Sequence, residues 1–151
     1  MSLKLRAEDA EDLKVMSAHM QDALIRVGDI AFLPRKRRLA LSLNRFCWER
    51  PPGRVSGKDA FERTNAGFHV EDVSSVKTRG MNRDDSEALL YLLAIVSRIE
   101  ADGAGEIELQ FAGGASLVAR VECVDAELVD LGESWLTDMR PEHNGTAASQ
   151  P

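Results

Sequence analysis

The sequence predicts a mainly β (α+β) domain built from curved antiparallel sheets, with a helix near the N-terminus and a short one near the C-terminus. The strongest evidence is a hairpin over residues 105–128. Ile107 and Leu109 alternate there with acidic residues, and a second alternating run follows Gly113 and Gly114. A period of two is typical of a strand with one buried face, and glycine provides the backbone freedom that a reversal needs. The hairpin therefore predicts a sheet with one face in water.

Length and composition indicate one globular domain. The chain has 151 residues, of which 44% are hydrophobic and 29% charged, with a net charge of −6. These values are typical of a folded domain with a real core, and the negative charge argues against nucleic acid as a partner. We expect a single domain over residues 1–143 and a flexible tail at 144–151.

Cysteine usage and apolar runs predict a cytoplasmic protein. Cys47 and Cys123 form no CxxC pair, so we expect two buried, reduced thiols. The first residues contain no apolar stretch of signal-peptide length. The longest apolar run, residues 88–96, is far shorter than the roughly 20 residues of a membrane span.

The N-terminal part predicts one helix followed by strands. Acidic residues precede an apolar stripe of Leu13, Met16 and Met20 at helical spacing, which indicates a helix over residues 7–19. Residues 22–27 and 29–33 favour strands, although helical spacing is also compatible with the first of them. A proline-led basic turn then occupies residues 34–38.

The run from 39 to 48 changes parity in its middle. Leu39, Leu41 and Leu43 share one face of a strand, whereas Phe46 and Trp48 fall on the other. A regular strand cannot bury both sets against one core. We expect either a β-bulge near residues 44–45 or a change in which face is covered, as in a strand that passes between the two sheets of a small barrel.

Three further segments complete the prediction. Residues 49–65 are rich in proline, glycine and charge, which predicts a long loop. Residues 86–99 are apolar on every side, which fits a buried strand or a helix, and the strand is favoured. Residues 129–139 suggest a short closing helix or turn.

No motif predicts catalysis, a metal or a cofactor. His19, His69 and His143 are far apart and share no ligand spacing, so no zinc site is expected. The sequence has no GxSxG, Walker or Rossmann pattern, and the glycines at 113 and 114 are better explained by a turn than by a phosphate site.

Charge is the one asymmetric feature. Residues 35–63 contain nine basic and three acidic side chains inside a chain of net charge −6. One interpretation is solvated charge on turns and edge strands. The other is a surface for a protein or another anionic partner. In the second case the contact residues would be Arg35, Lys36, Arg37, Arg38, Arg45, Arg50 and Arg54.

The favoured function is therefore a non-enzymatic binding or adaptor module. The first alternative is an enzyme that uses carboxylates on the wet face of the hairpin, namely Glu106, Glu108 and Glu122; it requires a deep pocket with a perturbed carboxylate. The second alternative is a structural homodimer formed through an unpaired strand edge.

Several segments resemble a known family. QDALIRVGDIAFLP, RRLALSLNRFCWE and GEIELQFAGGASLVARVECVDAELVDLGESW, with residues 141–143, resemble an alphaproteobacterial family known only as a domain of unknown function. The resemblance covers most of residues 7–143 except the 49–65 loop. It implies a bacterial cytoplasmic setting and assigns no activity, site or ligand.

The order of predicted elements also resembles a pleckstrin-homology domain. That resemblance implies a small barrel or sandwich of curved strands with a closing C-terminal helix, and a binding role more often than a catalytic one. Because a fold does not determine a function, it implies no particular ligand.

Overall fold

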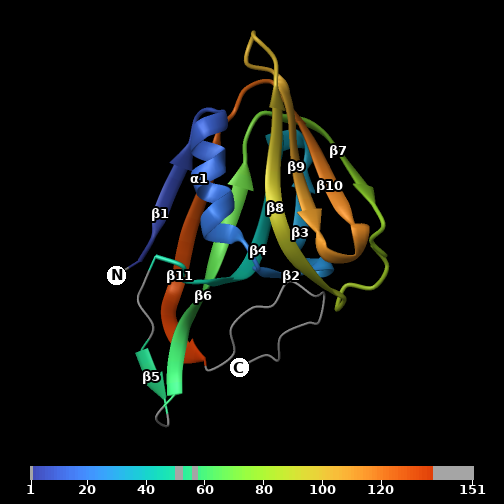
Figure 1. Ribbon diagram of the computed structural model, residues 1–151. Coiled ribbons are helices and arrows are strands. Elements are labelled where there is room, and N and C mark those ends of the chain that lie inside the picture. The colour runs from blue at the N-terminus through green and yellow to red at the C-terminus, as the bar shows by residue number, and fades with distance from the viewer. Residues whose placement is uncertain (1, 50–52, 56–57, 138–151) are drawn as a thin grey trace.

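The computed structural model describes residues 2–49, 53–55 and 58–137, and the side chains of residues 2–49 and 62–132. These residues form one antiparallel sheet of eleven strands, curled around the core, with one α-helix on its open side (Figure 1). The first elements are β1 (Lys4–Ala7), α1 (Ala10–Met20), β2 (Leu24–Arg26), η1 (Val27–Asp29), β3 (Ile30–Leu33), η2 (Pro34–Lys36), β4 (Arg38–Phe46) and β5 (Gly53–Val55). The others are β6 (Lys58–Val70), β7 (Val73–Arg79), β8 (Leu89–Ile99), β9 (Gly105–Phe111), η3 (Ala112–Gly114), β10 (Ser116–Val121) and β11 (Ala126–Thr137).

The sheet follows the order β1-β11-β6-β4-β2-β8-β9-β10-β7, with β3 added to β4 and β5 to β6. The mainly β antiparallel prediction is confirmed. The two ends of this path, β1 and β7, do not pair, so the sheet is not closed into a barrel. The helix α1 packs against both β1 and β8 and covers the open side of the sheet between them (Figure 1). The core is therefore closed on this side by side-chain packing, and not by hydrogen bonds between strands.

The N-terminal helix prediction is confirmed. The Asp9 carboxylate caps α1 by accepting from the Asp12 backbone N–H at 2.8 Å. Leu13, Met16 and Met20 are buried and pack into the core that the sheet surrounds. Among the described residues, no helix is long and apolar enough to cross a bilayer.

β4 contains no bulge where one was expected. It pairs residue for residue with β6, from Leu39 opposite Val70 to Phe46 opposite Arg63. The second alternative holds in part: Phe46 is buried on the opposite face, but the core-facing side stays covered as well, since Arg45 is buried there. The far end of β4 is thus covered on both sides.

The predicted long loop at 49–65 is wrong for most of its length. β5 pairs with the start of β6, and β6 already begins at Lys58. The alternation was obscured because polar side chains, Arg63 and Thr64, occupy buried positions in β6.

The favoured strand at 86–99 is confirmed as β8. Leu90 and Leu92 belong to the core, while Tyr91 is buried on the opposite face. The register against β9 shifts between Leu92 and Ala94, and the Ile95 N–H donates to Ser17 Oγ of α1 at 2.9 Å. The helix therefore satisfies a donor close to the irregularity.

The predicted C-terminal helix is wrong for the described residues. β11 runs to Thr137 and pairs with both β1 and β6. Two features hid the strand pattern: the charged Asp130 occupies an inward position, and the register shifts between Leu131 and Trp135, where Gly132 has φ +79°. The tail predicted at 144–151 lies outside the described residues.

Candidate functional site

The basic turn predicted as a contact surface is only partly free. Arg35 and Lys36 are exposed, and no ion pair joins them to another described residue. Arg37 pairs with Glu122 at 2.7 Å, and the hydrogen bond to this carboxylate raises the pKa of Arg37. Arg38 pairs with Glu71 at 2.8 Å. Acidic neighbours therefore neutralise half of the turn.

Arg45 does not lie on a surface. Its side chain is fully buried; Nε and Nη2 donate to the two Asp130 oxygens at 2.8 and 3.0 Å. Nη1 and Nη2 donate to the Glu49 oxygens at 2.9 and 2.7 Å. Burial alone would lower the pKa of Arg45, but the hydrogen bonds to Glu49 and Asp130 outweigh burial and raise it. This guanidinium holds the fold together and is not available to a partner.

The other two predicted contact residues give no further support. Arg50 lies outside the described residues, and Arg54 belongs to β5 but its side chain is not among those described.

Arg63, counted in the sequence only as charge, is buried beside Asn44. Its Nε donates to Asn44 Oδ1 at 2.6 Å, and its guanidinium lies 5.9 Å from the centre of the Phe46 ring. Burial lowers the pKa of Arg63 from its usual value. Because the Asn44 oxygen accepts from Arg63, the Asn44 amide group is held in one orientation.

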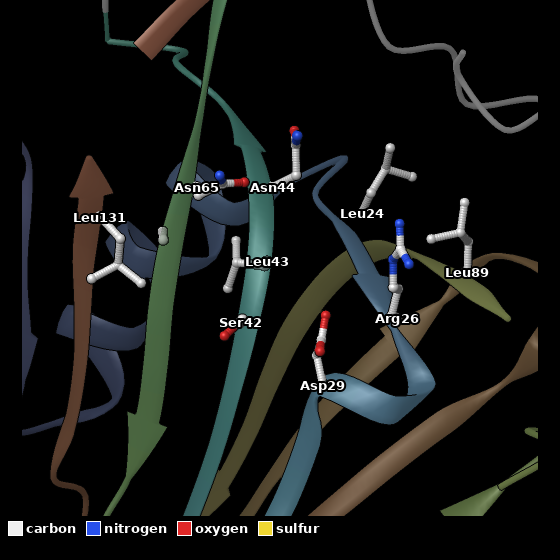
Figure 2. A pocket seen from close by; sticks show the side chains of 10 residues that line it. Leu24, Arg26, Asp29, Ser42, Leu43, Asn44, Asn65, Leu89 and Leu131 are labelled. Atoms are coloured by element: carbon white, nitrogen blue, oxygen red, sulfur yellow. The ribbon is translucent and has the colours of Figure 1, made fainter. Parts of the chain in front are cut away.

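An open trough lies on the outer face of the sheet. Two hollows of about 400 and 440 Å³ lie side by side over β4, β6 and β11. They share Asp29, Ser42 and Leu131 in their linings, so they form one continuous surface. Figure 2 shows Ser42 and Asn65 between Leu131 on one side and Leu24 and Leu89 on the other.

Small side chains make the floor of this trough. Ala31, Ala40, Ser42 and Gly67 occupy outward positions on β3, β4 and β6. A Cβ built on Gly67 would lie 3.6 Å from Leu131 Cδ1, an ordinary contact distance. The trough therefore exists because side chains here are short, and a larger residue at 67 would fill it without backbone strain.

The trough combines apolar walls with polar groups. Leu131 and Leu89 are 50% and 43% exposed, so both side chains are open to a ligand. Asn65, Ser42 and Asp29 have exposed side chains with no hydrogen bond to another described side chain. Such a lining provides hydrogen-bond donors and acceptors next to leucine side chains.

The carboxylates of the enzyme alternative do not converge. Glu106 and Glu108 both pair with Arg98, at 3.2 and 2.9 Å, whereas Glu122 belongs to the Arg37 pair. The three glutamates are therefore held in ion pairs on a solvent-facing side of the sheet and do not meet in one site.

The described residues contain no cluster of three or more histidine, cysteine or acidic side chains that could hold a metal. His69 contacts Glu71 at 2.8 Å and Glu127 at 3.4 Å. Cys47 is buried as expected, but Cys123 is exposed and donates to the Asp72 carboxylate at 3.2 Å. That hydrogen bond raises the pKa of the Cys123 thiol, which leaves it a weak nucleophile.

Sequence reasoning missed the trough. The signal was present in the leucine run at 39–44, where the outward residues Ala40, Ser42 and Asn44 are small or polar. One strand alone does not show which other strands lie next to these residues and complete the trough.

Fold and site together define a mainly β antiparallel domain that carries an open trough on one face of its sheet. The chain belongs to the DUF2948 family, described as a protein of unknown function, which matches residues 3–143. This match confirms the resemblance to a domain-of-unknown-function family. No curated protein and no solved structure matches the chain.

Proposed function

We propose that this protein is a non-enzymatic binding module that holds an extended segment of a partner protein in the trough. The observation that carries the proposal is the continuous hollow over β4, β6 and β11, with half-exposed leucines beside hydrogen-bonding groups that have no described partner. Binding sites typically combine apolar side chains with a small number of polar groups that fix the orientation of the ligand.

The chemistry of the lining favours a peptide. The Asn65 amide and the Ser42 hydroxyl can each donate to and accept from a peptide backbone. Leu131 and Leu89 offer apolar contact to its side chains. An anionic ligand fits less well, because Arg26 is engaged by Glu87 at 2.9 Å and Asp29 brings a negative charge into the hollow.

The basic turn supports a second candidate contact, with an anionic or acidic partner. Its support is that Arg35 and Lys36 are exposed and unpaired among the described residues. It is the weaker candidate, because Glu71 and Glu122 neutralise the adjacent arginines. A double charge reversal, Arg35→Glu with Lys36→Glu, distinguishes the two candidate contacts. It should weaken binding of an acidic partner to the basic turn and leave peptide binding in the trough unchanged.

The cytoplasmic location, the pleckstrin-homology likeness and the alphaproteobacterial origin are also proposals. A cytoplasmic location is supported by the free thiols of Cys47 and Cys123, since oxidising compartments favour disulfides. The pleckstrin-homology likeness and the alphaproteobacterial origin stay predictions; curved antiparallel strands support the former, and the strand at the C-terminal end of the described chain speaks against it.

A peptide-display selection tests the proposal. A random library would be panned on the wild-type protein and counter-selected on Gly67→Phe, which fills the trough. Enriched peptides should bind one to one by calorimetry and shift the amide resonances of Ser42, Asn65 and Gly67. Gly67→Ala is the matched control at the same position and should keep binding.

Three results would contradict the proposal. The selection could yield no binder, the peptides could map to another face, or Gly67→Phe could bind them as tightly as wild type. An off-site aromatic, Ser116→Phe on β10, checks that bulk on a sheet face is not by itself responsible.

A further inference from the structure

β7 is an open edge of the sheet. It has seven residues, and within the described chain it pairs only with β10 (Figure 1). On its other side, the backbone hydrogen bonds of the described residues reach only its first residue, where the Val73 N–H donates to the Arg37 carbonyl at 2.9 Å. An exposed edge of this kind presents unpaired backbone groups that can template another strand.

The register identifies the free groups. The Phe111 N–H donates to the Ala115 carbonyl, so odd-numbered residues of β10 bond to β9 and even-numbered ones bond to β7. Val118 lies opposite Lys77, and Ser116 lies opposite Arg79. The N–H and C=O groups of Lys77 and Arg79 therefore point to β10, whereas those of Val76 and Thr78 point to the open edge.

The side chains of β7 divide the edge into two faces. Lys77 and Arg79 are exposed on the outer face and form no ion pair with a described residue. They line a hollow of about 370 Å³ together with Arg98, whose charge is shared with two glutamates. On the inner face, Val76 packs against the core and is only partly buried.

The other end of the sheet lacks these features. β1 has four residues and continues almost directly into α1. Its cations are both engaged, Lys4 with Glu127 at 4.0 Å and Arg6 with Asp125 at 3.3 Å. Of the two ends of the strand path, β1 and β7, only β7 offers free backbone groups beside positive charge that is unpaired among the described residues.

We propose that the β7 edge binds an acidic, extended segment of a partner protein by strand addition. Backbone hydrogen bonds to Val76 and Thr78 hold the segment. Its acidic side chains lie beside Lys77 and Arg79, and its apolar side chains lie beside Val76. The expected ligand is therefore a stretch in which acidic and β-branched residues alternate. This surface is separate from the trough.

A second copy of this chain fits the edge poorly. Antiparallel self-pairing centred on Lys77 places this lysine opposite itself, and centring on Thr78 places Lys77 opposite Arg79. Centring on Val76 avoids both clashes, but it places Arg79 of the second copy opposite Val73, where the Arg37 carbonyl already occupies the edge. Like charges directly opposite each other on adjacent strands are destabilising. The charge pattern thus favours a foreign acidic strand over a homodimer at this edge.

Amide hydrogen exchange provides the test, because strand addition protects particular amides. The probe is a blocked peptide of alternating glutamate and valine, with seven residues to match β7. In the free protein, the Val76 and Thr78 amides should exchange fast and the Lys77 and Arg79 amides slowly. Adding the peptide should slow exchange at Val76 and Thr78. An alternating lysine–valine peptide should bind on the order of tenfold more weakly.

Two variants of the full chain sharpen the test. Lys77→Glu with Arg79→Glu should weaken binding of the acidic peptide by on the order of tenfold and favour the lysine peptide. Thr78→Pro removes an edge-facing donor while keeping both charges, so it should abolish protection at Val76. Lys14→Glu on α1 is the charge control and should bind normally, as should Gly67→Phe in the trough.

The proposal fails if the acidic peptide leaves exchange at Val76 and Thr78 unchanged, or if both peptides protect these amides equally. It also fails if Val76 and Thr78 are already protected in the free protein and sedimentation shows a dimer, because the edge would then pair with a second copy.

Discussion

Arg45 shows how one buried cation organises distant parts of the chain. It bonds Asp130, which lies 85 positions later, and Glu49 beside the end of β4. Asp130 also accepts from the Leu3 backbone N–H at 2.9 Å, so the same carboxylate holds β1. Bidentate arginine–carboxylate bonds are among the strongest hydrogen bonds in proteins, and they compensate the cost of burying these charges.

Removing this guanidinium should be severely destabilising. Arg45→Met keeps much of the volume but leaves the Asp130 carboxylate buried without its cation, a loss of about 3–5 kcal/mol in the free energy of unfolding. Urea denaturation measures it. Arg38→Met breaks a half-exposed ion pair and should cost less than about 1 kcal/mol. Equal losses in the two variants would show that Arg45 contributes no more than a surface pair.

Glu49 should make stability depend on acid pH. Burial alone would raise the pKa of Glu49, but hydrogen bonds from Arg45 and the backbone outweigh it and lower the pKa. A lowered folded pKa contributes stability above the unfolded value of about 4.3, and this stability is lost as pH falls through the folded pKa. The stability difference between wild type and Glu49→Gln should therefore be largest near neutral pH and shrink in acid. A difference independent of pH would contradict this.

At the scale of elements, glycine has opposite roles on two adjacent strands. Gly132 sits at the register shift of β11 with φ +79°, and nothing lies within 4 Å of a Cβ built there. Gly67 of β6 has a regular strand conformation and faces the trough. Gly132 is needed because the backbone adopts a positive φ there, whereas Gly67 leaves space for the trough because it has no side chain.

The two alanine variants should change stability in opposite directions. Gly132→Ala forces a left-handed conformation on alanine and should cost about 1–2 kcal/mol. Gly67→Ala reduces the entropy of the unfolded chain at an unstrained site and should gain roughly 0.5–1 kcal/mol. Thermal unfolding of both variants checks the contrast. Equal shifts would mean that the β11 irregularity needs no glycine.

Element prediction failed where polar residues occupy buried positions. The hairpin of β9 and β10 was evident, because Ile107 and Leu109 alternate with solvated glutamates. The beginning of β6 and the later part of β11 were missed, because Arg63, Thr64 and Asp130 are polar residues in buried places. Arg63 and Asp130 are acceptable there because Asn44 and Arg45 of β4 meet their charge and hydrogen bonds, which local periodicity does not report.

At the scale of the whole molecule, β1 protects one edge of the sheet. It pairs with β11 along its length, from Lys4 opposite Val129 to Ala7 opposite Ala126. Removing residues 1–7 would expose the β11 edge and deprive Asp130 of the Leu3 N–H. The truncated chain should be less stable to urea and should self-associate, as measured by size-exclusion chromatography.

A matched single variant is the control for this truncation. Arg6→Ala removes only an exposed ion pair with Asp125 and should remain monomeric, with stability within about 1 kcal/mol of wild type. If the truncated chain is equally monomeric and stable, the protective role of β1 is refuted.

The sequence by itself determined several local features of this protein: the helix α1, the β9–β10 hairpin and the absence of a known catalytic motif. At 86–99 it favoured a strand but left a helix open. These follow from spacing between near neighbours, which a single chain displays. Only the tertiary structure decided that Arg45 is a buried structural cation, that the sheet stays open at β1 and β7, and that outward residues of β3, β4, β6 and β11 meet in a trough. These features depend on contacts between residues far apart in sequence, and no local period encodes which strands become neighbours.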